Sequence, residues 1–243
     1  MPHVTVRKAY IRYREDLPES VNNFAALDGF RQLGVETAPF YGFGDIEELT
    51  DLGPEVMVVG FVGDVWNALR KMGRPLPKPM DYPEELRPWL GREVSRSTLG
   101  DVRRKLDPFF FKPVEEKLFT GFVWRSAMGD QIRVASLPDE TEVWVSDEVE
   151  FVSEYRCFVQ DDELVGVRHY KGDAFVAPKK ALVLEAIQAF QSGPRAYSLD
   201  FGVTDSGETK LVEVNDAYAL GHYGLPSITY ARLIDARWEE LTR

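Results

Sequence analysis

Three oxygen-bearing side chains near the end of the chain, Asp200, Glu213 and Asn215, have a spacing that could bring them side by side. Asp200 lies in YSLDFGV and the other two lie in KLVEVND, and the DSGE segment between them is typical of a hairpin turn. Because residues two apart in a strand point to the same face, Glu213 and Asn215 should project together. Carboxylates among apolar neighbours need partners, and Mg²⁺, which prefers oxygen ligands, would satisfy them. Pairing with arginines or exposure on a sheet surface would satisfy them as well.

Basic side chains in strand-like segments form a second candidate group. Lys112 follows the apolar run PFFF, and an apolar wall would strengthen its attraction to a phosphate. A lysine that extends its ammonium into water from a strand end would give the same pattern. Arg156 lies two residues after Glu154, so the two share a face. They form either an ion pair or a site where the planar guanidinium binds a carboxylate or phosphate.

The segment ELVGVRHYKGD contributes Arg168 and Lys171, which strand alternation places on opposite faces, with Tyr170 on the side of Arg168. Cys157 lies in the strand pattern YRCFVQ and is interpreted as a core residue rather than a nucleophile. His222 follows in the loop NDAYALGHYGLP, where it is a candidate to orient a nucleophile, although a loop of packed tyrosines would have the same sequence features.

The composition excludes several classes of function. The 40 acidic and 29 basic side chains give a formal net charge of -11, which would repel a nucleic-acid backbone. The single cysteine excludes an intramolecular disulfide and favours a reducing compartment. The sequence shows neither a signal peptide nor an apolar run of roughly 20 residues, which a membrane span would need. We therefore expect a cytoplasmic protein without a nucleic-acid or membrane partner; its oligomeric state is left open.

The elements that must position these residues fall into two parts. The segments VTVRKAYIRY, VNNFAALDGFRQLG, ETAPFYGF, VMVVGFV and VWNALRKMG alternate between strand and helix patterns, which predicts a parallel α/β domain. Gly34 fits the end of the first helix, since glycine tolerates positive φ. Five prolines in residues 73–88 indicate a connection, so we place the domain boundary at 1–80 and 81–243.

The second part contains strand patterns and two clear helices, over 177–190 and 228–241, with hairpin turns at QDDE and DSGE. The predicted fold class is therefore mixed, with a small N-terminal parallel α/β domain and a C-terminal antiparallel α+β domain.

Over roughly residues 90–225, the chain resembles the ATP-grasp superfamily, in particular a short arginine- and lysine-rich clade of bacterial and phage proteins. Asp200 and Glu213 are 13 positions apart and Asn215 follows two further on, as in ligases of the D-alanine–D-alanine type. PFFFKP resembles the family strand that ends in Lys-Pro, and TEVWVSDEVEFVSEYRCFV resembles its adenine hinge and the strand that follows. The resemblance implies an ATP-grasp fold that binds ATP and Mg²⁺.

The resemblance also assigns roles by position. It implies Asp200, Glu213 and Asn215 as metal ligands. As transition-state or phosphate-binding groups it implies Arg156, Arg168 and Lys171. The residues that it implies for nucleotide binding are Lys112, Lys117, Trp144, Val145, Ser146, Asp147, Glu154 and Lys171.

One position departs from the family pattern. Ser198 stands where members of the family usually have an arginine, two residues before the metal aspartate. The stabilising cation would then have to come from elsewhere, with Arg156 and Arg168 as the candidates.

The implied activity is that of an ATP-dependent carboxylate–amine ligase, which forms an amide or peptide bond through an acyl phosphate. Its partners would be ATP, a small carboxylate, and an amine or peptide acceptor. Two alternatives are carried with it: an ATP-dependent phosphotransferase on the same fold and a non-catalytic binding module.

Overall fold

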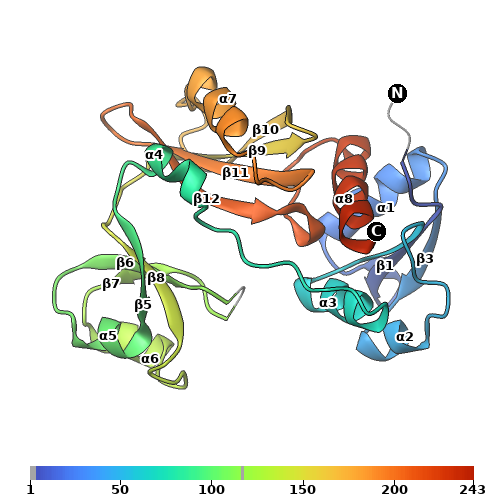
Figure 1. The fold of residues 1–243 in the computed structure, drawn as a ribbon, viewed down its shortest axis with the longest axis horizontal. Helices are drawn as coiled ribbons and strands as arrows, with labels where there is room; N and C mark the ends of the chain where they lie inside the picture. The colour runs from blue at the N-terminus through green and yellow to red at the C-terminus, as the bar shows by residue number, and fades with distance from the viewer. Residues whose placement is uncertain (1–3, 116–117) are drawn as a thin grey trace.

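The computed structural model of the protein describes residues 4–115 and 118–243, which contain three four-stranded sheets (Figure 1). The N-terminal sheet, an antiparallel sheet built from β9 to β12, and a second antiparallel sheet built from β5 to β8 are the three layers of strands. This arrangement confirms the predicted mixture of a parallel α/β part and an antiparallel α+β part.

The N-terminal sheet has β1 at its centre, with β3 and β4 parallel to it on either side and the short β2 in a hairpin with it. Gly34 has φ +76° just after α1, which confirms the expected helix end. The elements of this part are β1 (Lys8–Arg14), β2 (Leu17–Pro18), α1 (Val21–Gln32), β3 (Glu36–Phe40), α2 (Phe43–Glu48), β4 (Val56–Val59) and α3 (Val62–Lys71).

The central sheet has the strand order β10-β9-β11-β12 and is antiparallel throughout. The hairpin turns predicted at QDDE and DSGE join β9 to β10 and β11 to β12. Apolar residues of η1, α4 and α7 pack with one face of this sheet in a shared core. The elements are η1 (Glu84–Leu86), α4 (Arg87–Leu90), β9 (Ser153–Gln160), β10 (Glu163–Gly172), α7 (Lys180–Ala189), β11 (Ala196–Val203) and β12 (Thr209–Asp216).

The third sheet has the order β5-β8-β6-β7 and a small core of its own around Phe111 and Trp124, which are fully buried. Its helices have six residues each, too short to show a helical period in the sequence, and neither they nor β5 and β7 were expected. The elements are β5 (Val94–Thr98), α5 (Leu99–Arg104), β6 (Phe109–Pro113), β7 (Phe122–Trp124), α6 (Met128–Arg133) and β8 (Glu142–Ser146).

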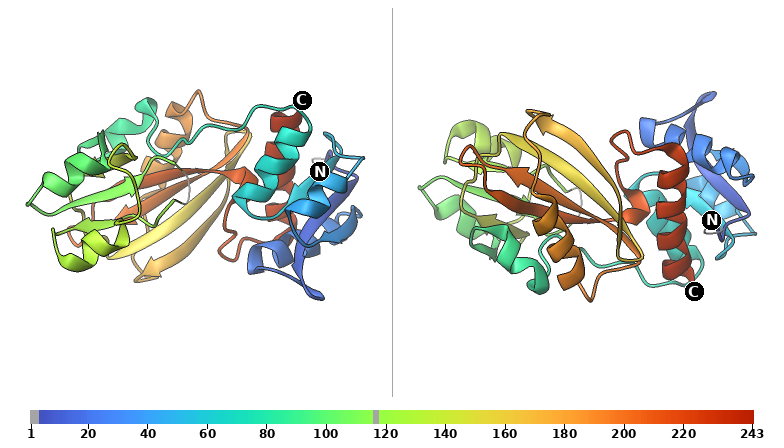
Figure 2. Two further views of the ribbon diagram at one scale, coloured as in Figure 1. Left: turned by 90° about the horizontal axis from the view of Figure 1, so that it is seen from below. Right: turned by 90° about the horizontal axis from the view of Figure 1, so that it is seen from above.

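The last helix, α8 (Ser227–Thr242), follows the short η2 (Ala217–Ala219) and packs beside α1, as both views of Figure 2 show. A Cβ added at Gly29 of α1 would lie 2.0 Å from the carbonyl oxygen of Ser227, so the close approach requires glycine. α8 thus shares the core of the N-terminal sheet, whereas the division at residue 80 stays a prediction. Among the described residues, no helix combines the length and apolar character needed to cross a membrane.

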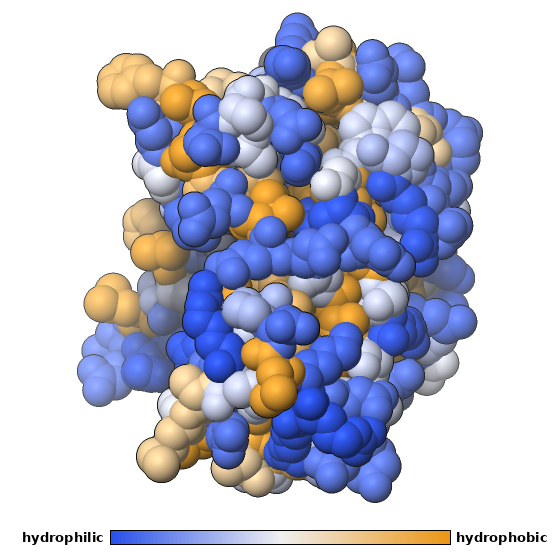
Figure 3. Space-filling model, turned by 90° about the vertical axis from the view of Figure 1, so that its left-hand side faces the viewer, coloured by the Kyte–Doolittle hydropathy of each residue, from blue (hydrophilic) through white to orange (hydrophobic). Residues whose placement is uncertain are grey.

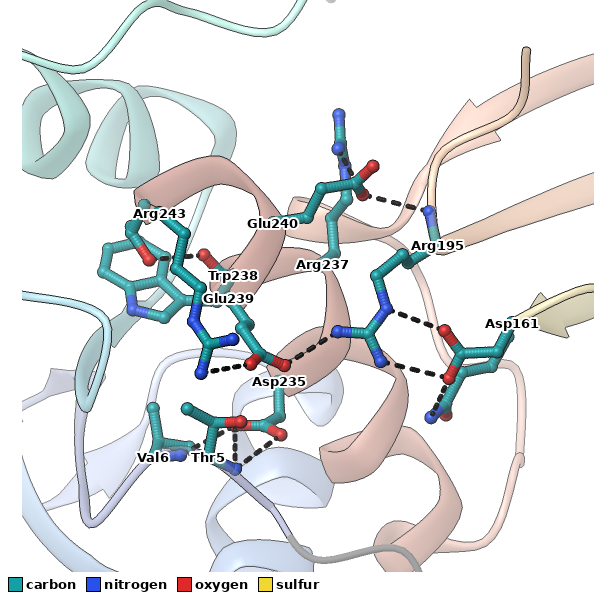
Figure 4. A network of polar contacts seen from close by, with 12 residues as sticks. Thr5, Val6, Asp161, Arg195, Asp235, Arg237, Trp238, Glu239, Glu240 and Arg243 are labelled. Carbon is teal, nitrogen blue, oxygen red and sulfur yellow. Dashed lines mark hydrogen bonds and ion pairs between the residues drawn. The ribbon is translucent and has the colours of Figure 1, made fainter.

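Charged residues of α8 connect the N-terminal segment to the central sheet (Figure 4). Asp235 accepts hydrogen bonds from the backbone N–H groups of Thr5 and Val6, each at 2.9 Å. Arg195, just before β11, donates to Asp161 in the β9–β10 turn and to Glu239 of α8, both at 2.7 Å. These contacts hold the β9–β10 hairpin and the start of β11 against α8.

Candidate functional site

A cavity of about 1030 Å³ lies between the central sheet and the β5–β8 sheet. Asn22 and Val62, at the starts of α1 and α3, contribute from the N-terminal part, and the loop after β12 contributes Tyr218 and Tyr223. The volume is at the upper end of the ~300–1,000 Å³ that small-molecule sites occupy. It would accommodate a nucleotide together with a second substrate.

The three predicted metal ligands meet on one wall of this cavity. In the β11–β12 hairpin, Asp200 pairs with Glu213, and Ser198 pairs with Asn215. The Nδ2 atom of Asn215 lies 3.3 Å from Asp200 Oδ2 and 3.2 Å from Glu213 Oε1, so the amide bridges the two carboxylates. A bulge at Val212, between the pairs made by Glu213 and Leu211, shifts the register beside the site.

The donor atoms of this group fit Mg²⁺. Two carboxylates and one amide are hard oxygen donors, and Mg²⁺ usually takes one or two protein carboxylates and completes its shell with water and phosphate oxygens. Within residues 4–115 and 118–243, no three His, Cys, Asp or Glu side chains are grouped as a metal site. The protein would therefore supply part of the coordination shell and a nucleotide the remainder.

Arg156 lies across the hairpin from this group and forms a buried ion pair with Asp200. Its Nε and Nη2 atoms donate to the two carboxylate oxygens at 2.8 and 2.6 Å. The pairing of β9 with β11 places Arg156 directly opposite Asp200, so the guanidinium comes from a neighbouring strand instead of from position 198. Ser198 is fully buried beside it.

Lys112 reaches the site from β6 and donates to both Asp81 and Glu213. Burial alone would lower the pKa of Lys112, but the charges of Glu213 and Asp81 outweigh it and raise this pKa well above its ordinary 10.5. Burial would raise the pKa of Glu213, and the charge of Lys112 with its hydrogen bond reverses that and lowers the pKa below 4.5. Both groups are therefore charged at neutral pH.

Glu154 is buried at the far end of the same face and holds two residues of β10. Tyr170 donates its hydroxyl to Glu154 at 2.8 Å, and Lys171 donates its ammonium to the other carboxylate oxygen. The expectation that Tyr170 and Lys171 lie on opposite faces was wrong. A register shift between His169 and Lys171 interrupts the alternation, so both side chains reach Glu154.

The predicted hinge residues divide between the cavity and the core. Ser146 and Asp147 line the cavity, whereas Val145 packs in the core of the β5–β8 sheet. Trp144 points to the side of the central sheet, where its ring meets that of Tyr82. Because adenine recognition at such a hinge uses backbone groups, these side-chain positions leave the hinge assignment a prediction. Lys117 lies outside the described residues.

Arg168 does not line the cavity. Its Nε donates to the carbonyl oxygen of Gly224 at 2.9 Å, in the loop that follows η2. The structure thus brings together nine of the predicted site residues in one cavity and leaves Trp144, Val145 and Arg168 outside its lining. The nine are Lys112, Ser146, Asp147, Glu154, Arg156, Lys171, Asp200, Glu213 and Asn215.

Sequence reasoning missed several cavity residues that come from connections. Asp81 and Tyr82 belong to the proline-rich segment, and Arg92 precedes β5. Arg92 donates to the backbone carbonyl oxygens of Leu211 and Val212 at 2.8 and 2.9 Å. An acid and an aromatic residue among prolines, in KPMDYP, were the available signal, but they do not differ from an ordinary exposed connection.

The loop after β12 is fixed to both parts of the molecule. Asp216 accepts two hydrogen bonds from Arg237 of α8, at 2.7 and 2.6 Å, so its charge is already compensated. The backbone N–H of His222 donates to the side-chain oxygen of Asn22 at 3.0 Å, and its Nδ1 accepts from the Gly224 N–H. Asp216 is therefore poorly suited to bind an amino group.

A family model described as an ATP-grasp domain, family 2 of its clade, matches residues 89–233, which is more than half of the chain. The chain belongs to the ATP-grasp family. This confirms the resemblance seen in the sequence. A search of curated proteins gave no match.

Solved ATP-grasp structures have a similar fold. D-cycloserine synthetase DcsG superimposes with a TM-score of 0.60 at 13% identity, over 95% of this chain and 99% of the other. D-alanine–D-alanine ligase from Bacillus anthracis, complexed with ATP, gives 0.55 at 14% identity, over 97% and 95%. The ATP-grasp ligase PsnB, complexed with its minimal precursor, Mg and ADP, gives 0.52 at 14% identity, over 98% and 99%. At these identities the similarity shows the ATP-grasp fold.

Proposed function

We propose that the protein is an ATP-dependent carboxylate–amine ligase that joins a small carboxylate to an amine or peptide acceptor through an acyl phosphate. One observation carries the proposal: Lys112, Arg156 and the bridged group of Asp200, Glu213 and Asn215 converge in one cavity. Cations and hard oxygen donors side by side suit a magnesium nucleotide. The ATP-grasp neighbours that act as ligases support the choice of reaction.

The residues of the chain would act by position and charge. When bound, ATP supplies the phosphoryl group that activates the acid, and Mg²⁺ neutralises phosphate charge. Asp200, Glu213 and Asn215 would hold the metal, and Lys112, Arg156 and Lys171 would neutralise the phosphates and the developing charge of the transition state. The residues that would perform these roles are already fixed by buried contacts, which limits reorganisation during the reaction.

No covalent step on the protein is needed. Cys157 is fully buried, and burial raises the pKa of its thiol to about 12, so it is a core residue as the sequence indicated. His222, the candidate base, is outside the cavity lining and has its Nδ1 occupied by a backbone N–H. The proposed acceptor is therefore an amine or peptide that enters with the acid, rather than a histidine of the described chain.

The binding-module alternative would use the surface instead of the cavity. Seen from the side of the β5–β8 sheet, hydrophobic side chains lie in separate groups among hydrophilic ones (Figure 3). That face offers a protein partner a broken apolar surface, whereas the cavity groups converge on one volume. The ligase proposal therefore explains more of the buried charge.

Isothermal titration with ATP and Mg²⁺ tests the nucleotide site. We expect binding to the wild type and loss of it in a variant with Glu213→Ala and Asn215→Ala. A matched variant with Asp205→Asn and Glu208→Gln, two exposed acids in the turn of the same hairpin, should bind like the wild type. Unchanged binding after the first double substitution would refute the site.

An assay of ADP release over pooled amino acids and short peptides then separates ligase from phosphotransferase. A ligase requires both an acid and a nucleophile for sustained turnover, so omission of either pool should stop ADP release. Sustained release with a single hydroxyl or phosphate acceptor would instead support the phosphotransferase.

A further inference from the structure

The connection between the N-terminal sheet and the rest of the chain enters the wall of the cavity at Asp81 and Tyr82. The carbonyl oxygen of Asp81 accepts a hydrogen bond from the Val214 N–H at 3.0 Å, which fixes the connection to β12 beside Glu213. The Tyr82 ring meets the Trp144 ring of β8 edge to face, with centroids 5.2 Å apart. This short segment therefore touches both sheets that enclose the cavity.

The Asp81 side chain shares one ammonium group with Glu213. Lys112 Nζ donates to both carboxylates, and the side chains of Asp81 and Lys112 are each 15% exposed, against 26% for Glu213. The same ammonium lies 5.6 Å from the centroid of the Tyr82 ring. Because solvent screens these partly buried charges only weakly, the hold of each carboxylate on Lys112 depends on the other.

We propose that Asp81 is a positioning residue, which retains Lys112 in the cavity and thereby leaves Glu213 free for Mg²⁺. The proposal rests on the proposed function, because it requires that Glu213 and Lys112 serve a magnesium nucleotide. With Asp81 present, Glu213 turns to the metal while Lys112 keeps a carboxylate partner. Without Asp81, Mg²⁺ must draw Glu213 away from a lysine that then stays poorly solvated and unpaired.

The charge of Asp81 gives this role a distinctive signature. Removing it weakens the attraction of the site for Mg²⁺, both because a negative charge is lost and because Lys112 competes harder for Glu213. The same removal reduces the repulsion of ATP phosphates when no metal is present. A residue that only supported the fold would weaken ATP binding equally with and without Mg²⁺.

Calorimetric titration of ATP into this chain, in EDTA and at graded Mg²⁺ concentrations, separates these effects. For Asp81→Asn we expect the Mg²⁺ concentration at half-maximal ATP affinity to rise about tenfold, the factor that corresponds to about one hydrogen bond to a charged group. The metal-free affinity for ATP should stay unchanged or increase. Asp81→Glu keeps the charge and should return the Mg²⁺ midpoint toward the wild-type value.

Asp51→Asn is the matched control. Asp51 accepts hydrogen bonds from the Lys8 ammonium and the Tyr10 hydroxyl, both at 3.0 Å, in the N-terminal part. It is thus also an aspartate held by a lysine beside a tyrosine, but outside the cavity lining. Its substitution should lower thermal stability without moving the Mg²⁺ midpoint.

Each outcome decides between the two proposals. If the wild type binds ATP with Mg²⁺ and the midpoint of folded Asp81→Asn is unchanged, the positioning role is wrong and the proposed function stands. Equal weakening with and without Mg²⁺ would make Asp81 a structural residue and overturn the role as well. A wild type that binds no ATP rejects both proposals. Should Asp81→Asn fail to fold, Asp81→Ser carries the same expectations.

Discussion

The buried ion pair between Arg156 and Asp200 should dominate the stability of the central sheet near the cavity. Arg156→Met keeps much of the apolar side chain but removes hydrogen bonds of 2.8 and 2.6 Å from a carboxylate that is 2% exposed. Breaking a buried pair on one side costs ~3–5 kcal/mol, because the remaining charge stays buried. Asn215 still donates to Asp200 at 3.3 Å, so we expect a loss near the lower end, about 3 kcal/mol.

A double-mutant cycle isolates the pair from the packing of the arginine stem. Asp200→Asn leaves Arg156 buried without its partner charge, while the variant with both Arg156→Met and Asp200→Asn has no buried charge at this position. The double variant should therefore be more stable than the sum of the single effects predicts, by about 2 kcal/mol. Urea unfolding without nucleotide or Mg²⁺ measures the three free energies, and equal m values show that the unfolded states are comparable.

Arg237→Met calibrates the energy scale. Arg237 binds Asp216 through two hydrogen bonds of 2.7 and 2.6 Å, with side chains 11% and 3% exposed, so the two pairs are closely matched. We expect a similar loss of stability. If Arg237→Met is costly while Arg156→Met costs less than ~1 kcal/mol, or if the Arg156 and Asp200 effects are additive, the reasoning about the cavity pair is refuted.

Two further predictions concern the N-terminal part. Gly29→Ala should lower the free energy of unfolding in urea by ~1–3 kcal/mol, because its methyl group would overlap the Ser227 carbonyl oxygen, whereas Gly44→Ala, with open space around it, should not destabilise the protein. The hydrogen bond from Arg12, working against burial, holds the pKa of Glu19 below its ordinary 4.5, so its contribution to stability is present above that pH and is lost on acidification. Glu19→Gln should therefore show a smaller loss of stability between about pH 5 and pH 3 than the wild type, measured by chemical unfolding at each pH.

The parts of the fold that could be predicted from the sequence are those with a long local pattern. The β11–β12 hairpin combines two apolar runs with a turn sequence, so the pairing of Asp200 with Glu213 followed from the chain itself. The helices expected over 177–190 and 228–241 occur at Lys180–Ala189 and Ser227–Thr242. In each of these segments the pattern spans enough residues to fix one period.

Contacts between distant segments were beyond this reasoning. The packing of α8 on α1 depends on the absence of a side chain at Gly29, and one glycine carries no information about which helix will approach it. The bulge in β10 that turns both Tyr170 and Lys171 to Glu154 leaves no trace in the alternation of residue types. Asp81 has the sequence context of a connection, because its role arises from Lys112, which lies 31 positions further along the chain.

The charges of the cavity show why those distant contacts matter for its chemistry. Lys112, Arg156 and Lys171 are each held by a carboxylate, whereas Arg92 donates to backbone carbonyl oxygens. A phosphate that approaches these cations must first compete with their carboxylate partners, and a metal ion must compete with the cations. ATP and Mg²⁺ that arrive together satisfy both sets at once, since the carboxylates turn to the metal as the cations turn to the phosphates. A site arranged in this way disfavours either ligand alone, so the same ion pairs that stabilise the sheet would also select the magnesium complex of ATP.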